Sequence, residues 1–145
     1  MTTLDLFVHG QPRTKGSWRP VMAGGKPRLI PQTAEKPWAL TVAWAAREKR
    51  PTLVPKPHAV SVELHFAFVS PKKPTNQFPT GDSDKLARSC LDALTGICWT
   101  DDVQVSELLV TKRYGAEPGV HIVVRAQESI SSRQNAPRDS QTQST

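Results

Sequence analysis

Residues 58–69 alternate between apolar side chains and polar or small ones. A period of two is the spacing of a β-strand, because successive side chains point to opposite faces of a sheet. The chain must therefore build a sheet with at least one buried face. The residues predicted to lie on that face are Val60, Val62, Leu64, Phe66 and Phe68. His65 falls in the opposite set, and we interpret it as a strand residue with its own hydrogen bonds.

Two segments, residues 33–50 and residues 82–94, have helical spacing instead. In the first, Trp38, Val42 and Ala46 recur at intervals of four, which places them on one face of a helix. The second begins with short polar residues and ends just before a glycine, and both are typical helix boundaries. The predicted caps are Thr33 for the first helix and Asp82 or Ser83 for the second.

The remaining periodic segments are short. Further strands are predicted at residues 4–8, 103–113 and 120–124. Residues 24–27, Gly-Gly-Lys-Pro, predict a hairpin turn within residues 13–30, a region that otherwise reads as loop-rich. From Gln127 onward the chain is polar without periodicity, which predicts a disordered tail over residues 127–145. The prediction is one small α/β (α+β) domain over residues 1–126.

Composition excludes several classes of protein. No apolar run approaches the roughly 20 residues of a membrane helix, and the first residues lack the basic and apolar regions of a signal peptide. Cys90 and Cys98 have no metal or redox spacing, so we expect reduced thiols in or near the core. The four histidines lack zinc spacing. We expect a cytoplasmic protein of a bacterium or of a phage-infected host.

The formal net charge is +6, and the first 50 residues carry nine Lys or Arg against three acids. Basic surface attracts a phosphate backbone, although solvated loop charge explains the same residues equally well. The candidates for DNA contact are Arg13, Lys15, Arg19, Lys72 and Lys73. Phe78 lies in the same loop as Lys72 and is expected to pack back on the domain instead of between bases.

Five of the thirteen acidic residues fall within residues 82–102, and all five are aspartates. They are Asp82, Asp84, Asp92, Asp101 and Asp102. Short carboxylates suit a hard cation such as Mg²⁺. The helical phase of residues 82–94 separates these acids. Asp84 lies at the edge of the apolar arc and faces a site beside the core, whereas Asp92 points nearly opposite the core and is predicted to pair with Arg88.

Carboxylates accompanied by cations are suited to phosphoryl transfer. Lys85 and Arg88 follow Asp84 within about one helical turn, where positive charge would stabilise phosphate oxygens. An EF-hand is excluded, because Leu86 holds the fifth position of a loop starting at Asp82 and the sixth position is not glycine. The chain has no P-loop, which argues against that type of ATP hydrolysis.

Four motifs occur in a fixed order with short spacings. They are Asp82-Ser83-Asp84-Lys85-Leu86, Leu91-Asp92-Ala93-Leu94-Thr95-Gly96, Trp99-Thr100-Asp101-Asp102-Val103-Gln104-Val105 and Lys112-Arg113-Tyr114. This order resembles the RusA-type Holliday junction resolvases, which are crossover junction endodeoxyribonucleases. Gly10-Gln11-Pro12 with Lys15-Gly16 is similar to the opening strand and turn of that family. The resemblance covers roughly residues 4–125.

The resemblance implies a small α/β fold with a mixed sheet and two main helices, and a homodimer. It also implies nicking of four-way DNA junctions at symmetric positions in recombination and repair, with Mg²⁺ as cofactor and Mn²⁺ as a substitute. The metal-binding catalytic acids would be Asp82, Asp84 and Asp102, with Asp101 beside them. Arg88 stands where the family carries a functional Lys, and Lys85 where it carries Asn. Both keep or add positive charge, so both are catalytic candidates.

Three functions stay open at this point. The leading hypothesis is a structure-selective endonuclease. A catalytically inactive module that binds DNA or junctions is the alternative, because Lys85 replaces an Asn. A basic structural protein would use the aspartates only for capping and surface charge. Mg²⁺-dependent nicking distinguishes the endonuclease from the inactive module. A thermal shift caused by divalent cations distinguishes a metal-binding protein from the basic structural protein, which would show none.

Overall fold

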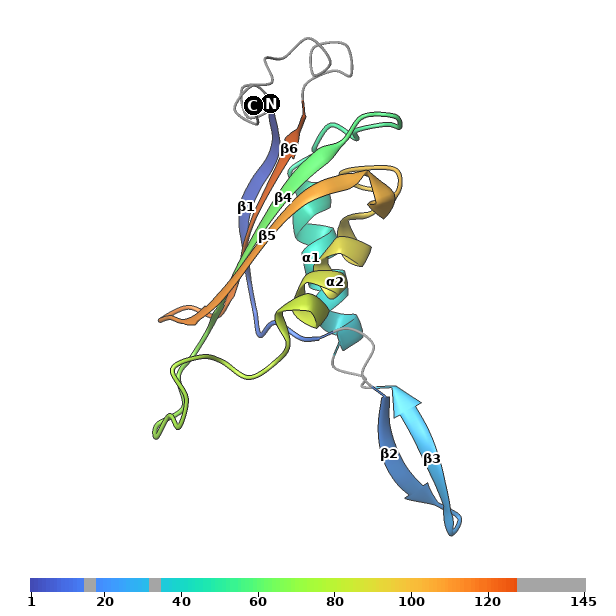
Figure 1. Cartoon of the computed structure of the whole chain (residues 1–145), viewed down its shortest axis with the longest axis vertical. Coiled ribbons are helices and arrows are strands. Elements are labelled where there is room, and N and C mark those ends of the chain that lie inside the picture. The colour runs from blue at the N-terminus through green and yellow to red at the C-terminus, as the bar shows by residue number, and fades with distance from the viewer. Residues whose placement is uncertain (15–17, 32–34, 128–145) are drawn as a thin grey trace, which may run out of the picture.

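The computed structural model describes residues 1–14, 18–31 and 35–127. It contains one four-stranded sheet, two helices and a separate two-stranded hairpin (Figure 1). The elements in chain order are β1 (Thr2–His9), β2 (Trp18–Ala23), β3 (Lys26–Pro31), α1 (Glu35–Glu48), β4 (Val60–Phe68), α2 (Ser83–Leu94), the 3₁₀ turn η1 (Asp102–Gln104), β5 (Val105–Tyr114) and β6 (Gly119–Ala126).

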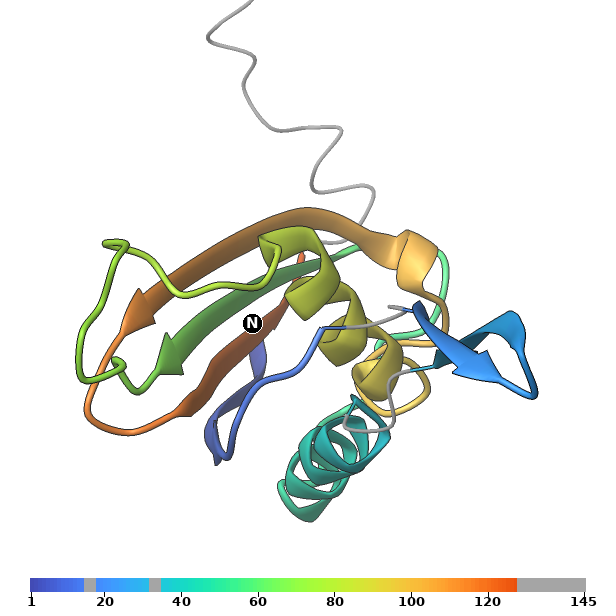
Figure 2. The same ribbon diagram turned by 90° about the horizontal axis from the view of Figure 1, so that it is seen from below.

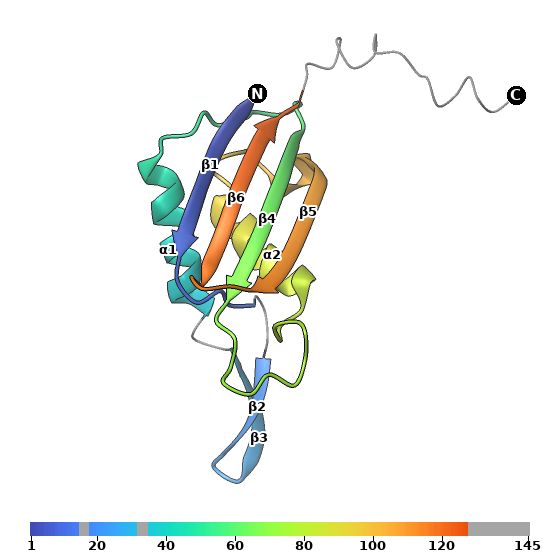
Figure 3. The same ribbon diagram turned by 90° about the vertical axis from the view of Figure 1, so that its left-hand side faces the viewer.

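The main sheet is mixed, as expected. Its strand order is β1-β6-β4-β5, with β6 antiparallel to both neighbours and β5 parallel to β4. Parallel strands need a long crossover connection, which is usually a helix. Helix α2 lies in that connection, so β4, α2 and β5 form one βαβ unit (Figure 3). The predicted α/β (α+β) class is confirmed.

Both helices cover the same face of the sheet, which Figure 3 shows with the sheet in front and the helices behind it. The predicted buried face of β4 is confirmed, since Val60, Val62, Leu64 and Phe66 are at most 1% exposed. The core residues supplied by the helices include Trp38 and Val42 from α1 and Leu86, Cys90 and Leu94 from α2. Cys90 and Cys98 are buried free thiols, and burial raises the pKa of each to about 12.

Within the described residues, no helix covers the second face of the sheet (Figure 2). That face carries polar pairs between neighbouring strands. His121 Nε2 lies 2.7 Å from a carboxylate oxygen of Asp5. His65 makes two hydrogen bonds, to Thr111 at 2.7 Å and to Glu63 at 3.0 Å. The interpretation of His65 as a hydrogen-bonded strand residue is therefore confirmed.

The prediction of a loop-rich region over residues 13–30 is wrong from residue 18 onward, because residues 18–31 pair as β2 and β3. The turn between them is as predicted. Gly24 and Gly25 have φ of +61° and +74°, the left-handed conformation that glycine adopts readily and that tight hairpins require. The prolines of this segment are poor evidence against a strand, because a two-stranded ribbon leaves one edge of each strand without a ladder.

The ends of two predicted segments differ from the structure. Helix α1 begins at Glu35, and Thr33, its predicted cap, lies outside the described residues. Most of the predicted tail, residues 128–145, also lies outside them. Gln127 belongs to the fold, since its backbone N–H donates to the Ala59 carbonyl oxygen at 3.0 Å. No helix in the described ranges is both long enough and apolar enough to cross a membrane.

Candidate active site

Helix α2 presents a charged stripe beside the sheet. Residues four apart lie on one side of a helix, and the positions in this stripe are Asp84, Arg88 and Asp92. The neighbouring side of the helix is buried and fixes its rotation. Its buried residues are Leu86, Ala87, Ser89, Cys90 and Leu94. The stripe is thus held in place at the boundary between the core and solvent.

A groove of about 450 Å³ lies between this stripe and the start of β5. Its lining residues on α2 are Ser83, Asp84, Ala87, Arg88, Leu91 and Asp92. Across from them are Asp102, Leu108 and Val110. Asp84 and Asp102, which the sequence assigns to one site, therefore line the same groove although a helix and a turn separate them in the chain.

The placement of Asp92 away from the site is wrong. Asp92 lines the same groove as Asp84 and Asp102. Helical phase does turn it away from the centre of the core, but the groove runs along the flank of α2 and is closed by β5. A helical wheel drawn for α2 alone contains no information about that second wall. The predicted pairing of Asp92 with Arg88 stays a prediction.

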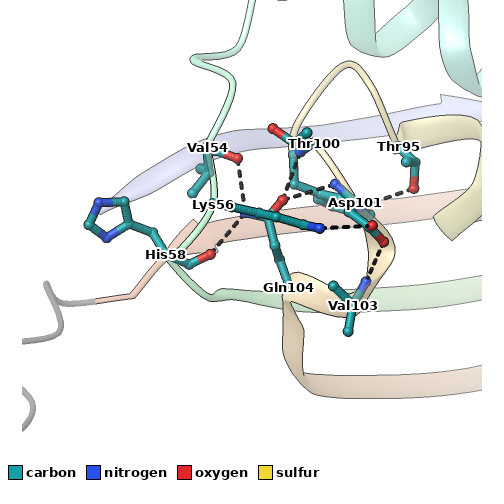
Figure 4. Close-up of polar contacts among 9 residues, drawn as sticks. Val54, Lys56, His58, Thr95, Thr100, Asp101, Val103 and Gln104 are labelled. Carbon is teal, nitrogen blue, oxygen red and sulfur yellow. Dashed lines mark hydrogen bonds and ion pairs between the residues drawn. The ribbon is translucent and has the colours of Figure 1, made fainter.

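Asp101 has a structural role in the turn before β5 (Figure 4). Its carboxylate accepts a hydrogen bond from the Val103 backbone N–H at 3.1 Å and lies 3.1 Å from Lys56 Nζ. The Val103 N–H and, after it, Lys56 lower the pKa of Asp101. Asp101 is not among the residues that line the groove. The next residue, Asp102, is the one that does.

Gln104 completes this turn. Its side-chain oxygen accepts hydrogen bonds from the backbone N–H groups of Thr100 and Asp101, both at 2.9 Å. Its amide nitrogen donates to the carbonyl oxygens of Val54 at 3.0 Å and His58 at 2.9 Å (Figure 4). Gln104 is buried, and these four bonds satisfy both polar atoms of its side chain inside the protein. The capping-box spacing of Asp101 and Gln104 was a usable sequence signal for this turn.

Asp82 occupies the N-cap position of α2 but makes no capping hydrogen bond with its side chain. It is exposed, and its carboxylate lies 3.6 Å from Lys85 Nζ. It is not among the residues that line the groove. The three predicted metal ligands thus divide into Asp84 and Asp102, which share a groove, and Asp82, which sits beside a cation at the helix start.

The groove offers oxygen donors that suit Mg²⁺. Among the described residues, no group of three or more His, Cys, Asp or Glu side chains forms a ready cage for a metal ion. Mg²⁺ does not need one, because it keeps several waters and is commonly held by one or two carboxylates plus substrate phosphates. Asp84 and Asp102 supply two carboxylates and Ser83 a hydroxyl. An all-oxygen set fits Mg²⁺ or Mn²⁺ better than zinc.

Comparison with known proteins bears on this geometry. The family model described as "Endodeoxyribonuclease RusA" matches residues 9–125. The chain belongs to the RusA family. The match includes both walls of the groove, and it implies endodeoxyribonuclease activity. A relative in Bacillus subtilis (strain 168), described as "Uncharacterized protein YqaN", is 27% identical over 138 residues, which cover 86% of this chain and 97% of that protein.

The two cations of this helix, Arg88 and Lys85, occupy different surroundings. Arg88 lines the groove between Asp84 and Asp92. Lys85 instead points to Asp82, as the 3.6 Å ion pair indicates. Both side chains are exposed, so each can reach a phosphate without crossing the core.

Two residues of the RusA-like Lys112-Arg113-Tyr114 motif hold the loop that leads to Asp82, a role that sequence reasoning missed. Lys112 Nζ donates to the Gly81 carbonyl oxygen at 2.7 Å, and the Tyr114 hydroxyl donates to the Phe78 carbonyl oxygen at 3.0 Å. The Phe78 ring itself is 55% exposed and lies 5.5 Å from Lys112 Nζ. Phe78 therefore packs back on the domain only in part, against Lys112, and about half of it is exposed.

The predicted DNA-contacting cations are only partly placed. Arg13 and Lys73 line a second hollow, next to the loop before α2. Lys72 is exposed in the same loop. Lys15 and the side chain of Arg19 lie outside the described part of the chain.

Proposed function

We propose that this RusA-family chain is a Mg²⁺-dependent endonuclease that resolves four-way DNA junctions. The observation that carries the proposal is the shared groove of Asp84 and Asp102, with Arg88 on the same wall as Asp84. Hard carboxylates and a guanidinium in one solvent-accessible groove are suited to holding a phosphodiester and its divalent cation. Asp82, Asp84 and Asp102 are the proposed metal ligands.

The metal, when bound, supplies activation of the attacking water and neutralisation of phosphate charge. Asp84 and Asp102 orient it from two rigid elements. Asp82, now 3.6 Å from Lys85 Nζ, would be the third residue to hold the metal, and Lys85 would then be available to contact the phosphate. The water oxygen bonds to phosphorus as the bond to the 3′ oxygen breaks, which leaves a 5′-phosphate and a 3′-hydroxyl.

Arg88 has a narrower role than the lysine of other family members. A guanidinium stays protonated at neutral pH and binds phosphate oxygens through two parallel hydrogen bonds. It therefore holds the phosphate and stabilises charge that develops in the transition state. It does not shuttle a proton, so the departing 3′ oxygen takes its proton from water.

Junction recognition requires contacts beyond the groove. Arg13, Lys72 and Lys73, together with Lys15 and Arg19, are the proposed contacts to the DNA backbone. Paired symmetric nicks need two sites related by symmetry, so we propose a homodimer with one groove in each subunit. Light scattering at micromolar concentration measures the oligomeric state directly.

A second function has one observation in its favour. Lys85 lies beside Asp82 and neutralises a proposed ligand, which suits a module that binds junctions without cutting them. Replacing Lys85 by Asn, the family residue, separates the two proposals. A nuclease cleaves with Mg²⁺ as the wild type and as Lys85→Asn, whereas an inactive module does not cleave as the wild type and gains activity only in Lys85→Asn.

The deciding experiment measures nicking of a synthetic four-way junction and of a linear duplex, with Mg²⁺ and with a chelator. Asp84→Asn and Asp102→Asn are expected to lower the cleavage rate by about 100-fold or more while junction binding persists. Asp5→Asn is the matched control, because Asp5 pairs with His121 on the opposite face of the sheet. Wild-type rates in both groove variants would refute the assignment.

A further inference from the structure

A second hollow, of about 350 Å³, opens beside the N-terminal end of α2. Three parts of the chain that are distant in sequence meet there: residues 11–14, residues 68–86 from the end of β4 through the loop to the first turns of α2 (Figure 1), and Tyr114 at the end of β5. We call it the loop pocket. Its size is at the lower end of the range of ligand sites, about 300–1,000 Å³.

The loop pocket combines apolar walls with polar and cationic groups. Phe68, Pro79 and Leu86 are buried residues among its lining. The polar side chains are Gln11, Arg13, Thr14, Lys73, Thr75, Asn76, Thr80 and Tyr114. Among the described residues that line it, none is Asp or Glu. A ligand that matches these walls has a flat apolar body, a hydrogen-bonding edge and negative charge, which is the chemistry of a nucleotide.

The pocket is held open by bonds that do not involve its ligand. Lys112 Nζ and the Tyr114 hydroxyl fix the carbonyl oxygens of Gly81 and Phe78 at 2.7 and 3.0 Å. Both donors belong to β5, which is paired along its length with β4. The wall of residues 78–81 is therefore tied to the sheet before any ligand arrives. A preformed site loses less conformational entropy on binding than a loop that must order itself.

The pocket also ends where the proposed metal site begins. Gly81 lines the pocket, and Asp82 is the next residue in the chain. Leu86, from the first turns of α2, forms part of the same wall. A nucleic-acid strand with a phosphate at the proposed metal site of Asp82 and Asp84 therefore has a neighbouring nucleotide at the mouth of the loop pocket.

We infer that the loop pocket binds one unstacked nucleotide of the strand to be cut, next to the scissile phosphate, and that it sets the base preference of cleavage. This inference rests on the proposed nuclease function. The base lies against the apolar walls, as aromatic and apolar side chains hold bases that leave a stack. Asn76 has both a donor and an acceptor for its edge. Arg13 and Lys73 contact the flanking phosphates.

The choice of a nucleotide over other ligands follows from the walls. A free phosphate would use the cations but not the buried apolar residues. A double helix keeps its bases stacked and cannot enter a pocket of this size. Removing a base from its stack is easiest where the duplex is already perturbed, and a branch point interrupts the continuous stacking of the helices.

The test is an abasic scan of a cleavable junction. Each nucleotide flanking the mapped nick is replaced in turn by an abasic unit, and affinity and single-turnover cleavage are measured for wild type, Asn76→Ala and Thr80→Val. Thr52→Val, an exposed threonine distant from the pocket lining, is the matched control. In wild type, one abasic position next to the nick is expected to weaken binding by about 5- to 150-fold, the range for loss of one base-specific contact.

In Asn76→Ala and Thr80→Val, the loss of affinity caused by the same abasic position is expected to fall to about threefold or less, because the specific contact is already absent. Junctions that differ only in the base at that position should then be cleaved at nearly equal rates. A penalty that is equal in wild type and both variants overturns the inference. Affinity is also measured in an Asp84→Asn background, so the pocket is tested even where cleavage is not observed. If the wild type shows no Mg²⁺-dependent nicking, the proposed function is refuted. The affinities for the abasic junctions then test by themselves whether the loop pocket binds a nucleotide.

Discussion

The ammonium group of Lys112 donates a 2.7 Å hydrogen bond to the carbonyl oxygen of Gly81, the residue before Asp82. The two residues are 31 positions apart, and the bond ties the edge strand β5 to the start of α2. The loop of residues 70–80 contains no helix or strand. Its last residues nevertheless have a fixed position, because β5 supplies both Lys112 and Tyr114 as anchors.

Lys112→Met should loosen this attachment while keeping most of the side-chain volume. We expect a loss of about 1–2 kcal/mol in the free energy of unfolding. We also expect a cleavage rate lower by tenfold or more, because displacing a catalytic group by about 1 Å can cost 100-fold. Urea denaturation and single-turnover nicking measure the two effects. Lys112→Arg retains a donor and should recover much of the rate; equal rates in Lys112→Met and wild type would contradict the prediction.

Gly81→Ala should be costly for a backbone reason. Gly81 has φ of +102°, a conformation that residues with a Cβ rarely adopt. Space is not the obstacle, because an added Cβ would meet Thr14 and Leu86 at 3.6 and 3.8 Å, ordinary contact distances. We expect a destabilisation of about 1–2 kcal/mol. We also expect cleavage to need a higher Mg²⁺ concentration, because a changed backbone conformation at residue 81 would displace Asp82.

Gly115→Ala is the control for Gly81→Ala. An added Cβ there would lie 3.5 Å from the Ala67 Cβ, and Gly115 is not among the glycines with positive φ. Thermal denaturation should show a markedly smaller loss for Gly115→Ala than for Gly81→Ala. Equal losses would mean that the conformation of Gly81 is not the cause.

Gln104→Ala should destabilise the protein by about 2–4 kcal/mol, because it strips partners from two carbonyl oxygens and two N–H groups at a buried position. The affected groups belong to Val54, His58, Thr100 and Asp101. Gln127→Ala is a suitable comparison, since Gln127 also makes side-chain hydrogen bonds but in an exposed setting. A change in the free energy of unfolding below about 1 kcal/mol for Gln104→Ala would contradict this account.

Asp101 should contribute to the acid sensitivity of the fold. Its pKa lies below the ordinary value of 3.8, chiefly because the Val103 N–H bonds to its carboxylate and next because of Lys56. A lowered pKa means that the contribution is complete above the unfolded pKa and is lost as the pH falls through the folded pKa. Asp101→Asn should therefore flatten the fall of stability below about pH 4.

The two causes of the Asp101 shift can be separated. Lys56→Met removes the ion pair and leaves the Val103 hydrogen bond in place, so the pKa of Asp101 should rise only part of the way to its ordinary value. Carboxyl titration by NMR measures this shift. A complete return in Lys56→Met would assign the whole effect to the ion pair.

Local patterns predicted the elements that build the core. The alternation in residues 58–69 identified the buried face of β4, and the phase of α2 placed Asp84 beside the core. Tertiary relationships decided the rest. Asp92 reaches the groove because β5 forms its second wall, and the role of Lys112 depends on a partner 31 residues earlier. Neither relationship leaves a periodic trace in the sequence.

The different roles of the adjacent residues Asp101 and Asp102 could not be predicted from the sequence either. The two aspartates are adjacent and identical in type, yet one is held by Val103 and Lys56 while the other lines the groove. The direction of each side chain follows from the 3₁₀ turn that begins at Asp102. The spacing of Asp101 and Gln104 is the one sequence feature from which that turn could have been predicted.

The groove and the loop pocket are assembled in different ways. One continuous stretch, residues 83–110, supplies every residue that lines the groove, whereas the loop pocket draws on three separated stretches. With the inferred role of the loop pocket in base preference, substitutions in residues 11–14 or 71–76 would alter which DNA is preferred and leave the groove intact. Descendants of such a chain are free to acquire new target preferences while inheriting the same cutting chemistry.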